Sequence, residues 1–465
     1  MRDAILFVII LLGIALSSLC QSGDQGSIGG TAFDDSGAVV VGAQVHVRNL
    51  GTSFVASTTT DDLGLFRFPV LPVGLYELTA GHSGFATAKV NQIDLTVGAQ
   101  LTLTLRFSVA GGNEATNVTD APPILEKSRS QLSTTIDNLF ISELPVNGRD
   151  FTAFVLLTPG VTRDVRGGLS FAGQRAMNSL LLDGVNNDDP FWGQPTGGTG
   201  FVGDGRQPYY ISQDAVGEFQ VNSNAYSAEF GRAGGGVVNA VTKSGTKDFY
   251  GSGFWFYRDK SLNANDPINK LYGLPRSPFH YNQFGGTLGG PIHRNRLFFF
   301  ANYEGLRQSL GETFTNFVPN AAFRAQVLAK SPALKPILDA YPVGQTPIDS
   351  ITDQLVGVET HTVREDAGMA RFDYRFDQNN SAYVRYNVDN AYIDDPTDAL
   401  GGHNVVPHVP TNIVVQFQHT FSPTLINEAK FGFNRANYHN WGYGTSPVAA
   451  DIPGFDSVSD TSLPS

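Results

Sequence analysis

The connections between short segments of alternating polarity constrain the fold of this chain most, because they fall into two length classes. Seven segments after residue 246 are predicted to be strands, at residues 250–258, 281–289, 297–304, 370–376, 381–389, 412–421 and 425–435. The joins at 290–296, 377–380 and 422–424 are short, and those at 260–278, 305–369 and 390–411 are long. A soluble sandwich also alternates, but two classes of join are typical of a transmembrane β-barrel, which has short turns at one rim and long loops at the other.

The two most regular segments separate apolar from polar side chains. Between residues 370 and 377 the even positions hold Ala, Phe, Tyr and Phe, and the odd positions hold Arg, Asp, Arg and Asp. Between residues 382 and 389 the even positions hold Ala, Val, Tyr and Val, and the odd positions hold Tyr, Arg, Asn and Asp. One face therefore suits lipid and the other a wet lumen. Because bacterial barrels close with an even number of strands, we expect these strands to be the front part of a longer wall, a fragment or a truncated product, with unpaired edges.

Composition agrees with many short strands and excludes one class of partner. The 465 residues include 51 Gly, 33 Phe and 16 Tyr, and only 16% are charged. Glycine turns and aromatic girdles produce such counts in barrel proteins. The formal net charge of -12, with no basic patch, argues against a nucleic-acid partner.

Residues 1–22 have the layout of a signal peptide. Arg2 precedes an apolar run from Ala4 to Leu16, which is followed by two serines. The run is too short for a membrane-spanning helix, and no other stretch approaches the roughly 20 apolar residues that such a helix needs. We expect cleavage after Cys20; lipidation of this cysteine is the alternative, although Leu19 stands where a small residue is required. No second cysteine exists, so the chain has no internal disulfide.

Residues 26–107 are predicted to form an antiparallel β-sandwich. Apolar side chains occupy every second position in runs around residues 43–47, 66–68, 76–80 and 101–107. Turns rich in Asp and Gly separate these runs at short spacing, as in sandwich domains.

A tether and a second compact unit lie between the sandwich and the wall. Residues 108–130 contain Gly and Pro clusters and indicate a flexible linker. Residues 131–245 predict an α+β unit. Apolar spacing indicates two short core helices, at 136–140 and 151–155, and strands at 178–182, 219–221 and 237–242. The first of these strands ends at an Asp-Gly turn, Asp183 and Gly184.

Several segments resemble the plug and barrel of TonB-dependent outer-membrane receptors, specifically the Oar-like branch. They are LPVNGRDF at 144–151, NSLLLDGV at 178–185, YSAEFGR at 226–232, GGVVNAVTKSG at 235–245 and NQFGGTLGGPI at 282–292. The resemblance implies that residues 131–245 are a plug and that residues 246–465 begin a barrel in the outer membrane of a Gram-negative bacterium. It also implies that a periplasmic TonB-type protein pulls on the plug.

The first domain resembles the carboxypeptidase regulatory-like domain, which has a carbohydrate-binding-like fold. The resemblance rests on one spaced set: Asp62, Gly64, Phe66, Phe68, Leu71, Gly74, Tyr76 and Leu78. The name does not imply hydrolysis, since no histidine begins an HxxE or HExxH pattern that would hold a catalytic zinc.

The candidate site residues lie in the tether and in one plug loop. The segment proposed to pair with the TonB-type protein is Glu114, Ala115, Thr116, Asn117, Val118, Thr119, Asp120 and Ala121. An extended tether could add as a strand to a partner's sheet edge, but Asn117 and Asp120 interrupt the small-apolar alternation, so a plain linker is the alternative. Phe191, Trp192 and Phe201 could stack on an external ligand, or pack within a loop. Residues 186–189 are interpreted as a solvated turn rather than a calcium site.

The sequence therefore predicts a mainly β outer-membrane receptor that takes up a bulky external ligand: a carbohydrate, a siderophore or a peptide. The sandwich favours carbohydrate. The alternative function is a surface adhesion or carbohydrate-binding protein without transport. No GxSxG elbow, GxxxxGK[ST] loop, cysteine nucleophile or histidine metal motif indicates an enzyme, and no cofactor or metal is predicted.

Overall fold

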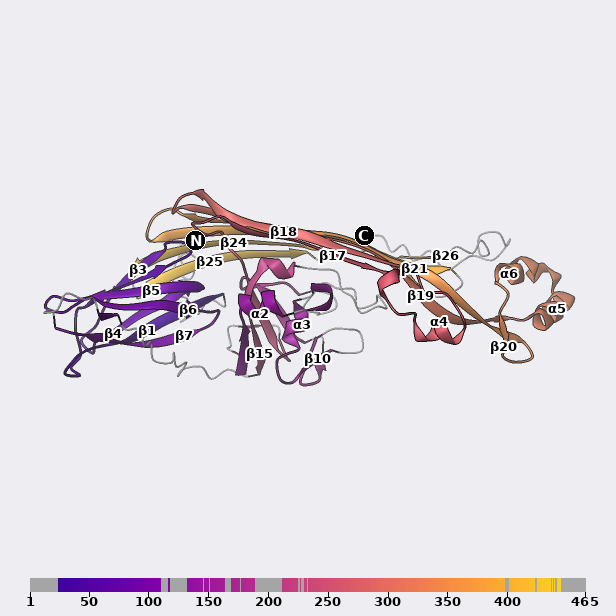
Figure 1. Cartoon of the computed structure of the whole chain (residues 1–465), viewed down its shortest axis with the longest axis horizontal. Coiled ribbons are helices and arrows are strands. Elements are labelled where there is room, and N and C mark those ends of the chain that lie inside the picture. The colour runs from indigo at the N-terminus through magenta and orange to yellow at the C-terminus, as the bar shows by residue number, and fades with distance from the viewer. Residues whose placement is uncertain are drawn as a thin grey trace, which may run out of the picture.

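The chain forms three parts in the computed structural model: a sandwich, a smaller α+β unit between residues 132 and 242 for which the name plug is kept, and a long curved wall of strands (Figure 1). The structure describes residues 24–109, 116–117, 132–144, 146–149, 151–163, 169–175, 177–188, 211–224, 226, 230–231, 233–397, 401–422, 425–435, 437, 439 and 441–444. The predicted signal peptide lies outside these residues.

Among the described residues, no helix is long and apolar enough to cross a membrane.

The sandwich has two sheets. The three-stranded sheet has the order β4-β1-β7, with β1 (Gln25–Asp34), β4 (Leu65–Pro72) and β7 (Gln100–Phe107). The five-stranded sheet has the order β3-β2-β5-β6-β8, with β2 (Gln44–Asn49), β3 (Val55–Thr59), β5 (Gly74–Gly81), β6 (Ala88–Leu95) and β8 (Thr116–Asn117). Alternate side chains of both sheets, among them Val45, Phe66 and Leu103, meet in one core.

The sandwich is not wholly antiparallel, contrary to the sequence prediction. β1 and β7 run parallel over their full lengths, from the pair Ser27 and Gln100 to the pair Asp34 and Phe107. Period-two alternation shows which face of a strand is buried, but it is the same for parallel and antiparallel neighbours. The direction of this pairing therefore could not be read from the pattern.

The plug is built on a five-stranded sheet of order β14-β13-β16-β15-β9. Its strands are β9 (Leu132–Ile136), β13 (Ser179–Leu182), β14 (Val185–Asn186), β15 (Val216–Asn224) and β16 (Val237–Thr242). A small three-stranded sheet contains β10 (Val161–Arg163), β11 (Leu169–Phe171) and β12 (Gln174–Arg175). Short helical turns complete it: α2 (Asn138–Glu143), η1 (Asn147–Arg149), α3 (Thr152–Val155) and η2 (Gln213–Ala215).

The two predicted core helices have different outcomes. Phe151, Phe154 and Val155 are buried at α3, as predicted. The first prediction is wrong in detail, because Leu139 and Phe140 are exposed and the buried residue of α2 is Ile141. Ile136 belongs to β9 instead. A helix of less than two turns has too few residues for its apolar spacing to fix which face is buried.

The wall is a ten-stranded open sheet, and each of its seven main strands contains or overlaps one of the seven predicted segments, although β19, β21 and β22 are much longer than predicted. They are β17 (Tyr250–Asp259), β18 (Phe279–His293), β19 (Leu297–Pro319), β21 (Thr352–Arg375), β22 (Asn380–Pro396), β24 (Thr411–Ser422) and β25 (Leu425–Arg435). Three short strands join them: β20 (Thr346–Pro347), β23 (Gly402–His408) and β26 (Trp441–Gly444). The pairing between neighbours is antiparallel throughout.

The longest predicted join, 305–369, is largely strand. β19 and β21 stay paired from Leu297 and Tyr374 to Pro319 and Thr352, so they form a ribbon far beyond the other strands. At its tip lie α5 (Ala321–Lys330), η4 (Pro332–Leu334) and α6 (Lys335–Ala340), at the right of Figure 1. The join 260–278 contains η3 (Lys260–Leu262) and α4 (Pro267–Leu271).

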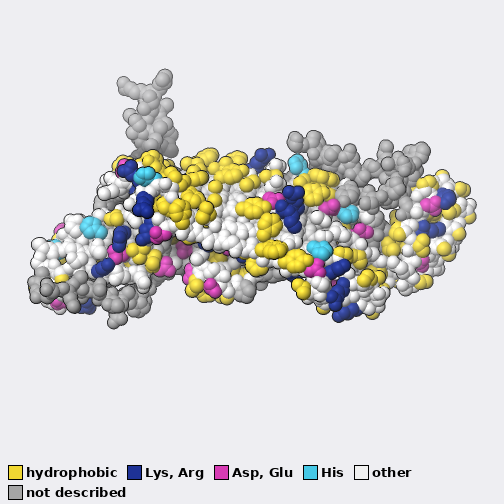
Figure 2. Space-filling view, turned by 45° about the horizontal axis from the view of Figure 1, so that its top comes forward, with side chains coloured by type: hydrophobic (Ala, Val, Ile, Leu, Met, Phe, Trp, Pro, Cys, Tyr) yellow, Lys and Arg dark blue, Asp and Glu magenta, His cyan; other side chains and the backbone are white. Residues whose placement is uncertain are grey.

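The two faces of the wall differ as the alternation predicts. Outward side chains are apolar and exposed, and Figure 2 shows them as a broad patch along the wall; they include Trp255, Phe372, Tyr386, Phe417 and Phe431. Inward side chains are buried and many are polar, including Arg385, Asn387, Asp389 and Gln416, whereas Phe300 and Met369 pack in the core of the plug. Short turns gather at the end where the sandwich lies, which is the periplasmic end in transmembrane barrels (Figure 1).

We predict that Gly30→Ala will disrupt the parallel pairing of β1 with β7. A Cβ atom at Gly30 would lie 2.0 Å from the backbone oxygen of Leu103, whereas one at Gly81 would meet nothing within 4 Å. Overpacking of this kind costs about 1–3 kcal/mol, so hydrogen exchange at the amides of β1 and β7 should accelerate. Gly81→Ala is the matched control and should change exchange by less than about 0.5 kcal/mol. Equal effects of the two substitutions would contradict this pairing.

Candidate functional site at the junction of plug, wall and sandwich

A hairpin turn places Asp183 against the wall. β13 and β14 are joined by Asp183 and Gly184, both in the left-handed region, with φ of 52° and 74°. Asp and Gly are the residues that accept such a turn most readily. The Asp183 side chain is fully buried, so its charge must be matched by protein groups.

Two arginines of the wall and one threonine of the plug surround this carboxylate. Arg385 Nε of β22 lies 2.5 Å from Oδ2, and Arg371 Nη1 of β21 lies 3.4 Å from Oδ1. Thr242, at the end of β16, donates its backbone N–H to Oδ1 at 2.8 Å and its hydroxyl to Oδ2 at 2.9 Å. Arg385 also donates to Asn412 Oδ1 at 2.6 Å, and Arg371 stacks on Tyr383 at 4.1 Å. We call Asp183, Arg371, Arg385 and Thr242 the ion cluster.

The ion cluster fastens the plug to the wall electrostatically. Burial alone would raise the pKa of Asp183, but Arg385, Arg371 and the Thr242 hydrogen bonds outweigh burial and hold that pKa below its ordinary value. Removing one partner of a buried ion pair typically costs about 3–5 kcal/mol, because the other charge stays buried without compensation. The plug therefore cannot leave this position without exposing or re-pairing these charges.

A second polar contact joins the plug to the neighbouring strands of the wall. Glu304 of β19 is buried; it accepts from Ser212 Oγ at 2.5 Å and from Gln283 Nε2 of β18 at 2.5 Å. Arg149 of η1 lies 3.7 Å from Glu304 and 2.8 Å from Asp214, and its guanidinium lies 3.8 Å from the centre of the Phe254 ring. These contacts attach the plug to β18 and β19, and Lys430 and Asn434 of β25 also donate to the backbone oxygens of Asp183 and Asp188.

The sandwich is docked on the short-turn end of the wall. Gln25 Nε2 donates to Glu428 Oε2 of β25 at 2.7 Å, and Asp24 Oδ1 lies 2.9 Å from Lys430 Nζ. The Arg375 guanidinium lies 5.1 Å from the centre of the Phe54 ring.

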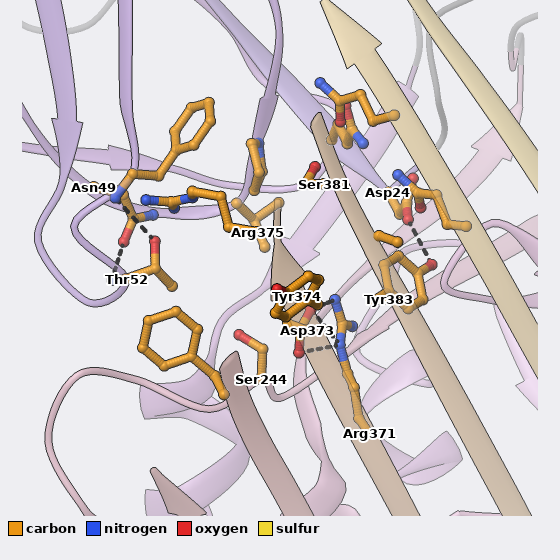
Figure 3. Close-up of a pocket in the computed structure, with 18 of the residues that line it drawn as sticks. Asp24, Asn49, Thr52, Ser244, Arg371, Asp373, Tyr374, Arg375, Ser381 and Tyr383 are labelled. Carbon is orange, nitrogen blue, oxygen red and sulfur yellow. Dashed lines mark hydrogen bonds and ion pairs between the residues drawn. The ribbon is translucent and has the colours of Figure 1, made fainter. Parts of the chain in front are cut away.

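A cavity lies between the three parts and is bounded on one side by the ion cluster. It contains about 990 Å³ of space that is partly open to solvent. Figure 3 shows Asn49 and Thr52 on one side, Tyr383 and Asp24 on the other, and Arg371, Asp373 and Arg375 between them. The sandwich, the plug and the wall therefore all line this one cavity, which has both polar and apolar walls.

The sandwich also contacts the plug through a buried carboxyl group. The backbone N–H of Val97, in the turn between β6 and β7, donates to Glu218 Oε1 of β15 at 2.6 Å, and Gln220 Nε2 donates to Val97 O at 3.2 Å. The pKa of Glu218 is raised to about 8, chiefly by burial and also by the nearby carboxylates of Asp94 and Asp137, although the Val97 hydrogen bond acts to lower it. The docked state therefore favours the neutral form of Glu218.

The predicted site residues are only partly described. Of the segment 114–121, Thr116 and Asn117 form β8, which pairs in parallel with Ala88 and Lys89 at the edge of the sandwich sheet. The rest of this segment, and Phe191, Trp192 and Phe201, lie outside the described residues. Their proposed roles stay predictions.

The turn at 186–189 is not solvated as predicted, because Asn187 and Asp188 are buried. Asp188 accepts from the backbone N–H of Leu180 at 2.6 Å and from Ser179 Oγ at 3.0 Å, and Asn186 Nδ2 donates to it as well. These contacts tie β14 back to β13.

Sequence reasoning missed the ion cluster, although part of the signal was present. Arg371 and Arg385 occupy positions predicted to face the lumen, and a buried lumen cannot hold such charges without partners. Asp183 was interpreted only as a turn residue. Its two arginine partners, Arg371 and Arg385, lie about 190 and 200 residues further along the chain, so no local sequence spacing reveals the contact.

Comparison with protein families gives two matches. Residues 241–464 match an outer membrane beta barrel domain, and residues 27–108 match a carboxypeptidase regulatory-like domain. The TonB-dependent transporter Oar of Myxococcus xanthus is 28% identical over 260 residues, which are 53% of this chain and 23% of that protein. The matched region thus spans about a quarter of that relative's length.

The solved structures that a structural comparison matches to this chain include two from Escherichia coli. The outer membrane transporter YddB is 12% identical, with a TM-score of 0.45 over 67% of this chain and 40% of that chain. The ferric-catecholate import receptor Fiu is 12% identical, with a TM-score of 0.38 over 71% of this chain and 53% of that chain.

We predict that Asp183→Asn will loosen the plug. Loss of the carboxylate charge leaves Arg385 buried without its ionic partner, so the free energy that seats the plug should fall by about 3–5 kcal/mol. Hydrogen exchange at the amides of β13 and β16 measures this change. The pKa of Asp183 is lowered in the seated plug, so its carboxylate should stabilise the seated plug of the unsubstituted protein at neutral pH. This stabilisation should be lost as the pH falls through that lowered pKa.

Asp373→Asn is the matched control for this substitution. Asp373 binds Arg371 at 2.9 Å, but both residues belong to the wall, and Asp373 is partly exposed. Loss of the Asp373 charge should therefore change hydrogen exchange in β13 and β16 much less than loss of the Asp183 charge. If both substitutions accelerated exchange equally, the ion cluster would not be the fastening point.

We predict that docking of the sandwich on the plug weakens with rising pH. A carboxyl group whose pKa is raised in the docked state stabilises that state fully below its ordinary pKa of 4.5 and loses its contribution as the pH rises through about 8. Each pH unit within this window changes the free energy of docking by at most about 1.4 kcal/mol. Hydrogen exchange at Val97, measured against Glu218→Gln at the same pH, isolates this effect. If the ratio of exchange rates at Val97 in the two proteins stayed constant from pH 5 to 8, titration of Glu218 would not control the docking.

Proposed function

This outer-membrane protein is a homologue of the TonB-dependent transporter Oar, with a carboxypeptidase regulatory-like domain before its barrel domain, and on this premise we propose that it performs energy-dependent uptake of a bulky external ligand. A TonB-type protein in the periplasm would supply the work by pulling on the tether. The outer membrane has no nucleotide pool or ion gradient of its own, so the work must come mechanically from inside.

The observation that carries this proposal is the fastened plug. The plug lies against the inner face of the wall and is held there by the ion cluster and by the contacts of Glu304. Passage of a large solute requires these contacts to break. Breaking buried ion pairs costs several kcal/mol, so passage needs an energy input rather than diffusion alone.

The arrangement of β9 suggests where the pull would act. β9 is the first plug strand after the tether, and it lies at the edge of the plug sheet, where its pairing partner among the described residues is β15. The pairing runs from Leu132 with Asn224 to Ile136 with Phe219. A pull on residue 131 would load the Leu132 end first, so the bonds would open in sequence rather than all at once.

Residues 114–121 are proposed to bind the TonB-type protein. β8 already lies in an extended conformation at a sheet edge, so release from β6 would free a strand for addition to a partner's sheet. The two-residue pairing with Ala88 and Lys89 is short, and its loss costs few hydrogen bonds.

The ligand is proposed to be a carbohydrate, a siderophore or a peptide, with carbohydrate favoured by the sandwich domain. Phe191, Trp192 and Phe201 are proposed to contact it, because aromatic rings stack on sugars and on apolar ligand surfaces. Uptake by cells should be assayed with fluorescent members of all three classes.

We predict that deletion of residues 114–121 abolishes both uptake and retention of the protein by a TonB-type periplasmic domain. Deletion of residues 123–130 shortens the tether by the same number of residues and should leave retention intact. Ligand binding to the cell surface should survive both deletions, because it does not require the tether. Binding without any uptake in unaltered cells, insensitive to uncouplers, would favour the alternative of a surface adhesion protein.

A further inference from the structure

Three ligating side chains from three strands of the wall meet outside the sites described above. They are Glu312 of β19, His361 of β21 and Asp395 of β22, and their ligand atoms all lie within 4.8 Å of one another. His361 Nδ1 lies 2.9 Å from Asp395 Oδ1 and 3.5 Å from Glu312 Oε1. One imidazole nitrogen and two carboxylate oxygens thus converge on one point.

Strand register brings these residues together on the inner face. Leu310 pairs with His361, so Glu312 is two residues further along the same face of β19. Thr362 pairs with Asp394, so His361 is opposite Asp395 across β21 and β22. Alternate residues of a strand share a face, and the three side chains therefore point to the same side of the sheet.

The group lies outside the bilayer. Glu312 is 15 residues beyond Leu297, the first residue of β19 at the short-turn end. At about 3.3 Å per residue and a tilt of about 40°, this corresponds to about 38 Å, beyond an apolar band of about 25 Å. Ions in the external medium can therefore reach this level of the wall.

The separations fit ligands of one metal ion. Zinc binds histidine nitrogen and carboxylate oxygen at about 2.0–2.2 Å, so adjacent ligand atoms in tetrahedral or octahedral geometry are roughly 3.0–3.5 Å apart. The two distances from His361 Nδ1, 2.9 Å and 3.5 Å, agree with this spacing, and the two carboxylate oxygens lie within 4.8 Å of each other. An ordinary hydrogen bond explains the first distance, but 3.5 Å is too long for the second.

Burial favours binding of an ion over a solvated acidic patch. The His361 side chain is fully buried and that of Asp395 is 9% exposed, whereas that of Glu312 is 24% exposed. The group is therefore enclosed on the histidine side and open beside Glu312, which leaves a path for an ion and room for a water ligand. Zinc sites with three protein ligands keep such an open position, which a water molecule fills.

We propose that Glu312, His361 and Asp395 bind one divalent first-row transition metal ion, with Zn²⁺ as the best fit. The neutral imidazole supplies a nitrogen ligand that Ca²⁺ and Mg²⁺ do not favour, since these ions prefer sets of six or more oxygens. The bound ion joins β19, β21 and β22 at the base of the protruding ribbon. This site is independent of the proposed uptake function.

The test is metal binding by the full chain in detergent. Wild-type protein should bind one more equivalent of Zn²⁺ per chain than His361→Ala, and Co²⁺ should give visible d–d absorption bands that His361→Ala lacks. Glu312→Gln and Asp395→Asn should each weaken this binding by at least about 100-fold, since loss of even an outer partner costs 10–100-fold. Mg²⁺ in excess should not displace the ion.

His403→Ala is the matched control. His403 Nδ1 lies 2.7 Å from Asp394 Oδ1 in the same part of the wall, but this pair is not within the three-residue group. The variant should retain full binding. The alternative is that His361 only forms ion pairs with the two carboxylates and binds no metal. In that case His361→Ala would lower the unfolding temperature by the same amount with and without Zn²⁺. Such a result, or equal Zn²⁺ stoichiometry in wild type and His361→Ala, would overturn the proposal.

Discussion

A charge removed from water must be matched by protein groups, and this requirement determines how the plug sits in the wall. Asp183 is buried on a left-handed turn and meets Arg371 and Arg385 from two adjacent strands. The turn belongs to the plug and the arginines to the wall, so the match exists in one relative position of the two parts. The ion cluster therefore fixes the position of the plug in the wall as well as stabilising it. The shape of the cavity beside the cluster depends on that position.

The sandwich depends on the same arrangement. Its contacts reach wall residues Glu428 and Lys430 and plug residues Glu218 and Gln220. Both sets can form together only when the plug is seated in the wall. Movement of the plug is consequently coupled to the docking of the sandwich, and the neutral form of Glu218 contributes to the seated state.

Period-two alternation made the wall predictable because lipid contacts one face and the lumen the other. The predicted strand starting points at 250, 297 and 425 agree with β17, β19 and β25. Beyond the bilayer neither face meets lipid, so outward residues such as Thr313 and Thr315 lose the apolar signal, and the sequence pattern indicates a loop instead of a ribbon. The candidate sites were harder to predict, because Asp183 with Arg385, and Glu312 with His361 and Asp395, are brought together by strand pairing rather than by sequence spacing.

The ribbon of β19 and β21 has a consequence for encounters outside the cell. Segment 305–369 could have been a coil whose tip samples a wide volume, but the continuous pairing to Pro319 and Thr352 removes most of that conformational entropy. The helices α5 and α6 are therefore presented in a narrow range of directions, already ordered before any contact. An incoming molecule need not supply the free energy of ordering the tip, and its approach is restricted to matching orientations.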